Sequence, residues 1–211
     1  MSAWAVVVAG GTGSRFGAPK QFAMLDGRPL VAWAVDAARG AVDGVVLVVP
    51  AERVGAAGGF GADAVVAGGA CRADSVRAGL AAVPPDASVV VVHDGARPLA
   101  TAALFRAVVA AVEAGTDGAV PGLAVADTLK RVDGERVTTT VGRQGLVAVQ
   151  TPQAFRAEVL RRAHAAGGDA TDDAAMVEAL GATVRVVPGD PRNIKVTTPA
   201  DLELVQALVG R

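Results

Sequence analysis

Short runs of Val alternate along this chain with Ala-rich stretches whose apolar residues repeat at helical spacing. The Val runs predict strands, which we place at residues 3–9, 44–49, 63–67, 88–92, 117–121 and 183–187. The Ala-rich stretches predict helices near residues 29–39, 73–82, 101–114, 155–166, 172–180 and 199–209. Uninterrupted apolar runs are typical of strands that are buried on both faces. The alternation of strands and helices therefore predicts an α/β fold, with a Rossmann-like, mostly parallel sheet and helices on both faces.

The loop after the first predicted strand, AGGTGSRFGAPKQF at residues 9–22, combines glycines with cations. In open parallel sheets, ligands bind outside the carboxyl ends of the strands. Glycines let backbone N–H groups approach phosphate oxygens, so the loop is expected to meet a negatively charged ligand. The HDGARP segment at residues 93–98 follows another apolar strand and is expected at the same edge of the sheet.

The spacing of this loop differs from both familiar phosphate-binding motifs. A P-loop needs Gly directly before its Lys, but Pro19 precedes Lys20. A dinucleotide fingerprint needs a third glycine, and Phe16 occupies that position. The next strand-like run also ends at Pro50, where a carboxylate would hold a ribose. A dehydrogenase is therefore disfavoured, although a phosphate ligand remains indicated.

Residues 127–141, DTLKRVDGERVTTTV, interrupt the alternating pattern with polar sequence. The Asp133-Gly134 pair between two short polar segments is typical of a hairpin turn. Two interpretations stand: a solvated surface hairpin, or an arm that contacts a second subunit. We expect one domain over residues 1–211, with an arm at about 127–143.

Composition narrows the classes of protein. The formal net charge is −1, which gives no general attraction to nucleic acid or to an anionic membrane. One cysteine and two histidines argue against a Cys-based zinc site, an internal disulfide or a His-rich metal site. Aromatic residues make up only 3% of the chain, which disfavours stacking on single-stranded nucleic acid. The N-terminus lacks a basic segment and no apolar run reaches membrane-spanning length, so we expect a cytoplasmic protein.

Lysine is rare, since 17 of the 20 basic residues are Arg and Lys occurs only at positions 20, 130 and 195. Such usage is typical of a coding bias that converts generic cations to Arg. A retained lysine then indicates a site that needs a compact point charge, which a guanidinium does not reproduce. The alternative is that three exposed lysines have survived by chance. Composition alone does not decide between these two interpretations.

Two further segments carry candidate chemistry. Asp94 in HDGARP stands where a carboxylate could bind a metal or ligand, and Arg97 could bind an anion. An ordinary Asp-Gly turn with a solvated Arg97 explains the same residues. In GGACRADSVRAGL (residues 68–80), Arg72 and Ser75 stand near a predicted helix start, which suits an anion or a polar base edge. A plain helix cap at Asp74 or Ser75 is again the simpler interpretation.

Taken together, the motifs resemble the 2-C-methyl-D-erythritol 4-phosphate cytidylyltransferase family of the non-mevalonate isoprenoid pathway. The resemblance covers residues 3–207 and rests on AGGTGSRFGAPKQF, GGACRADSVRAGL, HDGARP, DTLKR, TPQAF and NIKVTTPADL, in that order. It implies a nucleotidyltransferase fold, CTP and a sugar-alcohol phosphate as substrates, Mg²⁺ or another divalent cation, and a homodimer. It also implies in-line attack of the acceptor phosphate on the α-phosphorus of CTP, with release of pyrophosphate.

The resemblance assigns roles to individual positions. The catalytic cations would be Arg15, Lys20 and Lys195. The nucleotide contacts would be Ala9, Gly10, Gly11, Gly13, Gly69, Arg72, Ser75, Asp94 and Ala96. Asp94 would also bind the metal. The acceptor contacts would be Arg97, Thr128, Arg143, Thr151 and Thr171, of which the residues on the arm would serve the neighbouring subunit.

Some positions depart from the family pattern. Val147 stands where Trp is usual, Ala70 and Cys71 where polar or acidic residues are common, and Arg192 where Asp is frequent. These departures affect the expected cytidine contacts and the wall of the acceptor pocket. None of them removes a predicted catalytic cation.

Two alternatives stand beside the main interpretation. One is a cytidylyltransferase for ribitol phosphate or another sugar-alcohol phosphate, which would differ only on the acceptor side. The other is a non-catalytic nucleotide-binding subunit of the same fold, whose signature would be the loss of Arg15, Lys20 or Lys195, and all three are present.

Overall fold

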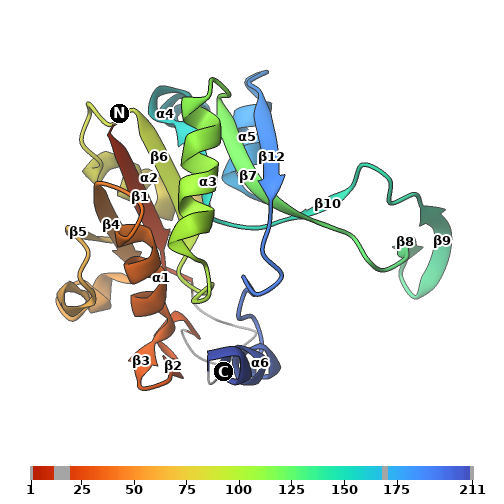
Figure 1. Ribbon diagram of the computed structural model, residues 1–211, viewed down its shortest axis with the longest axis horizontal. Coiled ribbons are helices and arrows are strands. Elements are labelled where there is room, and N and C mark those ends of the chain that lie inside the picture. The colour runs from red at the N-terminus through yellow and green to blue at the C-terminus, as the bar shows by residue number, and fades with distance from the viewer. Residues whose placement is uncertain (1, 12–19, 168–170, 210–211) are drawn as a thin grey trace.

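The computed structural model of the protein describes residues 2–11, 20–167 and 171–209. Within these residues, eight strands form a central sheet in the order β10-β7-β11-β6-β1-β4-β5, with β12 also paired to β7 (Figure 1). Four adjacent strands are parallel, namely β5 (Ala64–Ala67), β4 (Gly44–Val49), β1 (Ala3–Val8) and β6 (Val89–Asp94). Val8 pairs with Asp94, so β1 and β6 end together at one edge of the sheet.

The other half of the sheet is mixed. Strand β11 (Gln153–Arg156) lies antiparallel between β6 and β7 (Gly118–Ala124). Strand β12 (Val184–Pro188) is parallel to β7, and β10 (Val147–Val149) is antiparallel to it. The predicted α/β fold with a mostly parallel sheet is confirmed.

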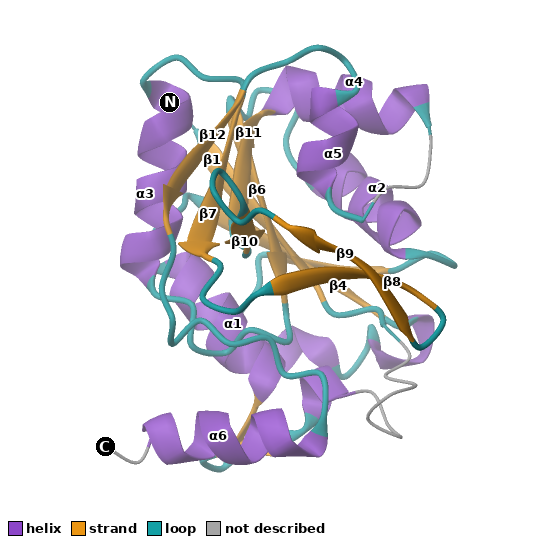
Figure 2. Cartoon of the chain, turned by 90° about the vertical axis from the view of Figure 1, so that its right-hand side faces the viewer, coloured by secondary structure: helices purple, strands orange, loops and turns teal. Residues whose placement is uncertain are grey.

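Helices cover both faces of the sheet, as predicted. One face carries α1 (Leu30–Arg39) and α3 (Ala102–Glu113), and the other carries α2 (Arg72–Ala82), α4 (Ala157–Ala166) and α5 (Asp173–Glu178). Figure 2 shows α3 and the α2–α4–α5 group on opposite sides of the strands. The last helix, α6 (Pro199–Val209), lies below the sheet against the short strand pair β2 (Met24–Leu25) and β3 (Arg28–Pro29). Short 3₁₀ turns span Lys20–Phe22, Ala51–Arg53 and Ala57–Phe60.

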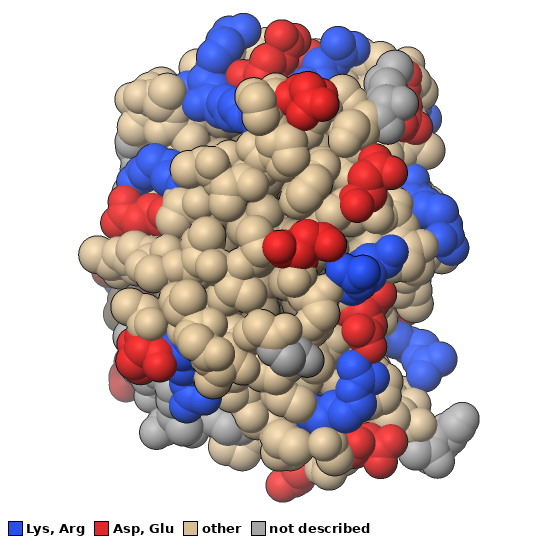
Figure 3. Space-filling model, turned by 90° about the vertical axis from the view of Figure 1, so that its left-hand side faces the viewer, with Lys and Arg blue, Asp and Glu red and all other residues tan. Residues whose placement is uncertain are grey.

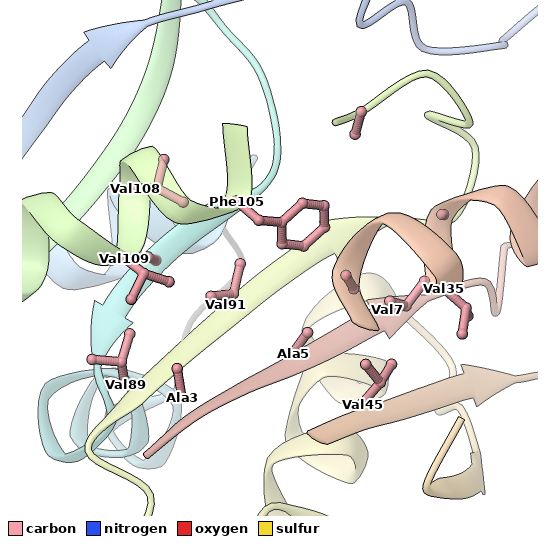
Figure 4. Packing of buried hydrophobic residues seen from close by; sticks show 14 of the residues in the cluster. Ala3, Ala5, Val7, Val35, Val45, Val89, Val91, Phe105, Val108 and Val109 are labelled. Carbon is pink, nitrogen blue, oxygen red and sulfur yellow. The ribbon is translucent and has the colours of Figure 1, made fainter. Parts of the chain in front are cut away.

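Alternate residues of the central strands supply two separate cores. Val7, Val45 and Val91 pack with Val35 of α1 and Phe105 of α3 (Figure 4). The intervening strand residues face the α2–α4–α5 side. Full burial of a Val side chain contributes roughly 1.5–3 kcal/mol to the free energy of unfolding, so these runs of Val hold the strands that carry the site.

Gly79 lets α2 lie close to the sheet. A Cβ at this position would be 2.3 Å from Val6 Cγ1 and 2.9 Å from Val48 Cγ2. Any side chain would therefore push the helix away from β1 and β4. The close packing places the N-terminus of α2 beside the carboxyl end of β1.

Four short strands outside the arm differ from the predicted pattern, namely β2, β3, β10 and β11. We expected a helix from residue 155, but residues 153–156 form β11 and α4 starts at Ala157. The reason is tertiary, because Ala154 pairs with Val91 of β6 and with Ala119 of β7. Strand β10 also has no counterpart in the prediction, since its three residues are exposed.

The polar segment forms the hairpin that we predicted. Strands β8 (Leu129–Asp133) and β9 (Arg136–Val141) pair with each other and project from the body (Figure 1). Asp133 pairs with Arg136, so the turn centres on Gly134 and Glu135, one residue later than expected. Gly134 has a φ of +55°, a conformation that favours glycine.

The face on the β5 side carries Lys and Arg side chains interspersed with Asp and Glu (Figure 3). This face shows no broad patch of a single sign. Among the helices of the described residues, none is long and apolar enough to span a bilayer.

Candidate active site

Two adjoining pockets lie at the carboxyl ends of β1 and β6. The larger, about 500 Å³, is lined by Val8, Ala9, Gly10, Gly11, Lys20, Gln21, Gly69, Ala70, Cys71, Arg72, Ser75, Asp94, Ala96 and Lys195. The smaller, about 210 Å³, is lined by Arg72, Asp94, Arg97, Val149, Gln150, Thr151, Gln153, Thr171, Asp172 and Lys195. Arg72, Asp94 and Lys195 belong to both, so two ligands could meet at these three side chains.

The first loop is held at the larger pocket by Gln21. The Gln21 side-chain amide donates to the carbonyl of Ala9 and, at 2.7 Å, to the carbonyl of Gly11. Gln21 itself is buried. These bonds fix the backbone of the glycine segment, and Lys20 lines the same pocket from the adjacent position.

The N-terminus of α2 faces the larger pocket. Its cap is Cys71, since the Cys71 sulfur accepts from the Asp74 N–H and the Asp74 carboxylate accepts from the Cys71 N–H. The predicted caps, Asp74 and Ser75, are therefore wrong as N-cap residues. Instead, the Ser75 hydroxyl accepts from the Gly69 N–H at 3.2 Å and donates to the Cys71 carbonyl at 3.1 Å. The positive end of the helix dipole favours an anion here.

Three cations surround Asp94. Its Oδ2 lies 2.7 Å from Lys195 Nζ and 3.8 Å from Arg97 Nε, and its Oδ1 lies 3.8 Å from Arg72 Nε. The Asp94 side chain is only 13% exposed. Burial by itself would raise the pKa of this carboxyl, but the charges of Lys195, Arg72 and Arg97 lower it to about 2. Asp94 is thus ionised at neutral pH, and the excess positive charge around it suits polyanionic ligands.

Lys195 reaches Asp94 because hydrogen bonds join two segments that are distant in the sequence. The Val196 N–H donates to the Ala96 carbonyl at 2.9 Å, and Arg97 Nη1 donates to the Asn193 carbonyl at 2.7 Å. The Lys195 side chain is 41% exposed. Its ammonium can therefore contact a ligand while it remains paired with Asp94.

The buried His93 is linked to Arg97 directly and to Asp94 through Thr151. Burial, together with the nearby charge of Arg97, lowers the pKa of His93 to about 4, so its ring is neutral at pH 7. The Arg97 carbonyl, 3.3 Å from Nε2, can only accept, so Nε2 carries the proton. Nδ1 then accepts from the Thr151 hydroxyl at 3.1 Å, and the same hydroxyl accepts from the Asp94 N–H at 3.0 Å.

The predicted nucleotide contacts gather in the larger pocket. Its lining includes Ala9, Gly10, Gly11, Gly69, Arg72, Ser75, Asp94 and Ala96, together with the predicted catalytic residues Lys20 and Lys195. Gly13 and Arg15 lie outside the described residues. The Ser75 hydroxyl is already engaged with the backbone, so its described contacts fix the loop and the helix relative to each other.

The predicted acceptor contacts fall into two groups. Arg97, Thr151 and Thr171 line the smaller pocket. Thr128 and Arg143 do not line it; both are exposed on the arm, where Arg143 donates to the Ala126 carbonyl. The Thr151 proton is used by His93, so in this arrangement its hydroxyl supports Asp94 and has no proton left to donate to a phosphate.

The described carboxylates fit a divalent cation only in part. In the described parts of the chain, no group of three or more His, Cys, Asp or Glu side chains is arranged to hold a metal. Mg²⁺, however, keeps several waters and binds to one or two carboxylates together with substrate phosphates. Asp94 is placed to supply one such carboxylate beside a nucleotide.

Several supporting residues had no role in the prediction. They are Gln21, His93, Gln150, Asp172, Asp173 and Asn193, all of which are buried or line a pocket. Gln21, His93 and Asn193 stand in motifs that the sequence displays, so their position was a usable signal. Their hydrogen-bond partners depend on tertiary contacts and could not be derived from spacing.

Comparisons with known proteins agree with this geometry. The family model of 2-C-methyl-D-erythritol 4-phosphate cytidylyltransferase matches residues 3–211. Enzymes of that name from Nocardia farcinica and Rhodococcus opacus are 49% and 50% identical, over 98% and 97% of this chain and 94% of each relative. The crystal structure of the Thermus thermophilus enzyme of that name superposes with a TM-score of 0.83 at 36% identity, covering 98% of both chains. The chain therefore belongs to the 2-C-methyl-D-erythritol 4-phosphate cytidylyltransferase family.

Proposed function

We propose that this protein transfers a cytidylyl group from CTP to the phosphate of 2-C-methyl-D-erythritol 4-phosphate. The products are 4-diphosphocytidyl-2-C-methyl-D-erythritol and pyrophosphate, and the step belongs to isoprenoid precursor synthesis in the cytoplasm. Family membership supports this activity. The observation that carries it is the junction of two pockets at Arg72, Asp94 and Lys195, where a nucleotide and an acceptor phosphate can be brought into contact.

The larger pocket would hold CTP. Its glycine-rich loop and the N-terminus of α2 offer backbone N–H groups to the triphosphate. The smaller pocket would hold the acceptor, with Arg97 as its buried cation and Thr171 at its wall. An acceptor oxygen would then attack the α-phosphorus in line, opposite the departing pyrophosphate.

The chemistry needs little proton transfer, because the attacking phosphate is already ionised at neutral pH. Catalysis then depends on bringing two anions together and on stabilising the charge that develops at phosphorus. Lys20 and Arg15 would act from the nucleotide loop. Lys195 would act from the junction, since its ammonium is fixed by Asp94 yet partly exposed.

A divalent cation fits this arrangement at Asp94. Mg²⁺, when bound, neutralises part of the triphosphate charge and orients its oxygens. Asp94 would supply the protein carboxylate, while Lys195 and Arg72 would keep that carboxylate ionised and oriented. Excess chelator is expected to abolish turnover, and full activity under those conditions would contradict this part of the proposal.

The arm would complete the site of a second copy. Arg143 and Thr128 do not line the pockets of their own chain, and Val132 and Val137 on the hairpin are 57% and 54% exposed. A lone hairpin is marginally stable in water. A two-fold dimer would cover these residues with the same surface of the neighbour, and each arm would deliver Arg143 to the other acceptor pocket.

Measurement of pyrophosphate release tests the activity. The purified protein would be assayed with each of the four ribonucleoside triphosphates, using methylerythritol phosphate or ribitol phosphate as acceptor. The highest kcat/KM is expected for CTP with methylerythritol phosphate. A higher kcat/KM with ribitol phosphate would show that the protein is a ribitol phosphate cytidylyltransferase. Binding of CTP without turnover would show that it is a non-catalytic nucleotide-binding subunit.

A further inference from the structure

A buried carboxylate that has no place in the proposed chemistry lies behind the junction of the two pockets. Asp173 begins α5 and is fully buried. Its Oδ2 lies 2.7 Å from Arg72 Nη2, and its Oδ1 lies 2.9 Å from His164 Nε2. A buried charge is unfavourable unless it is paired; burial by itself would raise the pKa of Asp173, but His164 and Arg72 lower it.

Arg72 is held by two carboxylates at two different nitrogens. Nη2 faces Asp173, while Nε faces Asp94 at 3.8 Å. Because the guanidinium is planar and rigid, two ion pairs at different nitrogens restrict how its plane can turn. Although burial by itself would lower the pKa of Arg72, the charges of Asp173 and Asp94 raise it. The side chain is 30% exposed and lines both pockets, so the rest of the guanidinium is presented to ligands.

The segment that carries Asp173 also forms the wall of the acceptor pocket. Thr171 and Asp172 line the smaller pocket, and Asp172 caps α5 and accepts from Gln153. Asp173 follows directly and contacts Arg72, which lines the same pocket. The acceptor wall and the orientation of Arg72 are therefore set by three consecutive residues.

We propose that Asp173 is a positioning residue that orients Arg72 at the junction of the two pockets, with His164 holding the second carboxylate oxygen. This inference rests on the proposed function, because the junction is where CTP and the acceptor would meet. Without Asp173, Arg72 can turn fully toward Asp94 and compete with Lys195 for it. Misplacement of a charged group by about 1 Å from the reacting atoms can reduce turnover by about 10²-fold.

The test is a double-mutant cycle of Asp173→Asn and Arg72→Ala, with kcat and KM measured for both substrates. Asparagine keeps the size of the side chain and its acceptor for His164. We expect Asp173→Asn to lower kcat/KM by roughly 10- to 100-fold, and the double variant to be no worse than Arg72→Ala alone. Losses that multiply in the double variant would overturn the inference.

Val177→Ala is the matched control. Val177 is fully buried on the same helix and belongs to the hydrophobic cluster on the α2–α4–α5 side, so it reports what loss of stability in α5 does to turnover. The inference requires Asp173→Asn to lose clearly more activity than Val177→Ala at equal Tm. Equal losses would make Asp173 a structural residue only.

A readout independent of turnover is the ¹⁵N NMR signal of the Arg72 Nε–H, assigned by its absence in Arg72→Ala. The signal should shift or broaden in Asp173→Asn and remain in place in Val177→Ala. If Asp173→Asn does not fold, His164→Ala replaces it in the same cycle, with a smaller loss that again disappears without Arg72. Wild-type protein that fails to turn over CTP would reject the proposed function, whereas an unchanged NMR signal in a folded variant would reject only the positioning role.

Discussion

The rim of the sheet, where the two pockets lie at the carboxyl ends of β1 and β6, differs from the arm in how its charged residues are held. At the rim, Asp94 is held by three cations, and its backbone N–H donates to the Thr151 hydroxyl in the loop between β10 and β11. On the arm, Arg143 donates to one nearby carbonyl and is otherwise exposed. The rim is thus fixed by its own chain before any ligand binds, whereas the arm needs a second surface to define where Arg143 points.

The largest expected difference between the two regions is in kcat after a lysine is removed from each. Lys195→Ala and Lys20→Ala should each lower kcat by about 10²–10³, roughly 3–4 kcal/mol, by analogy with loss of one donor to a developing charge. Lys130→Ala is the control, since this exposed lysine on the arm contacts only Thr140 among the described hydrogen bonds. Steady-state turnover of the three variants is the measurement. Near wild-type turnover of Lys195→Ala would show that the reaction does not take place at the rim.

A pH titration of stability tests how rigidly the rim is built. The pKa of His93 is about 4 in the folded protein and about 6.5 in an unfolded chain. Between these values the unfolded state binds the extra proton, so the free energy of unfolding falls as the pH drops from about 6.5 to about 4. The full shift corresponds to about 3 kcal/mol.

His93→Gln removes this titration while it keeps a donor and an acceptor. Urea unfolding across that pH range should therefore give a flatter dependence for the variant, with parallel curves for the two proteins from pH 7 to 8. Identical slopes below pH 6.5 would show that the histidine is not buried as a neutral ring.

For the arm, Arg143→Ala should raise the KM for methylerythritol phosphate and leave that for CTP nearly unchanged. A hydrogen bond to a charged group contributes roughly 1.5–3 kcal/mol, so the expected rise is about 10- to 100-fold. Arg136→Ala on β9 is a matched arm control with wild-type constants expected. An equal rise in the KM for CTP would place Arg143 outside the acceptor pocket.

Mixing the Arg143→Ala and Lys20→Ala variants tests whether the arm acts in the site of a second subunit. If arms reach into neighbouring sites, a heterodimer of Arg143→Ala with Lys20→Ala contains one site with both groups intact. Activity should then return in part after subunit exchange. No recovery in verified heterodimers would mean that Arg143 does not act across a dimer.

The smallest expected effect concerns the cap of α2. Cys71→Ser keeps a capping side chain and should leave the free energy of unfolding nearly unchanged, whereas Cys71→Ala should lower it by about 1 kcal/mol. Thr101→Ala, at the cap of α3, is the control for a cap remote from the pockets. A larger KM for CTP in Cys71→Ala than in Thr101→Ala would show that the cap also orders the rim.

Much of the fold followed from local pattern, because continuous Val runs have few alternatives to a buried strand. Residues 153–156 were misassigned because their strand exists through pairing with β6 and β7, which no local pattern encodes. The described motif residues that were predicted to contact the nucleotide line one pocket, because their motifs follow strands that end at the same edge of the sheet. The residues that support them, His93, Asn193 and Asp173, were missed because their hydrogen-bond and ion-pair partners are remote in sequence. The polar sequence of the arm predicts that Arg143 is exposed, but it does not predict which ligand or subunit Arg143 contacts.

The backbone bond from Val196 to Ala96 also sets when the protein becomes competent. Asp94, Arg72 and Arg97 are all made early in synthesis, but Lys195 joins them only when the segment before α6 docks on the HDGARP loop. A nascent chain can thus form most of the parallel sheet while its reacting centre still lacks its bridging ammonium. Until that late segment docks, the cluster around Asp94 lacks one of its three cations.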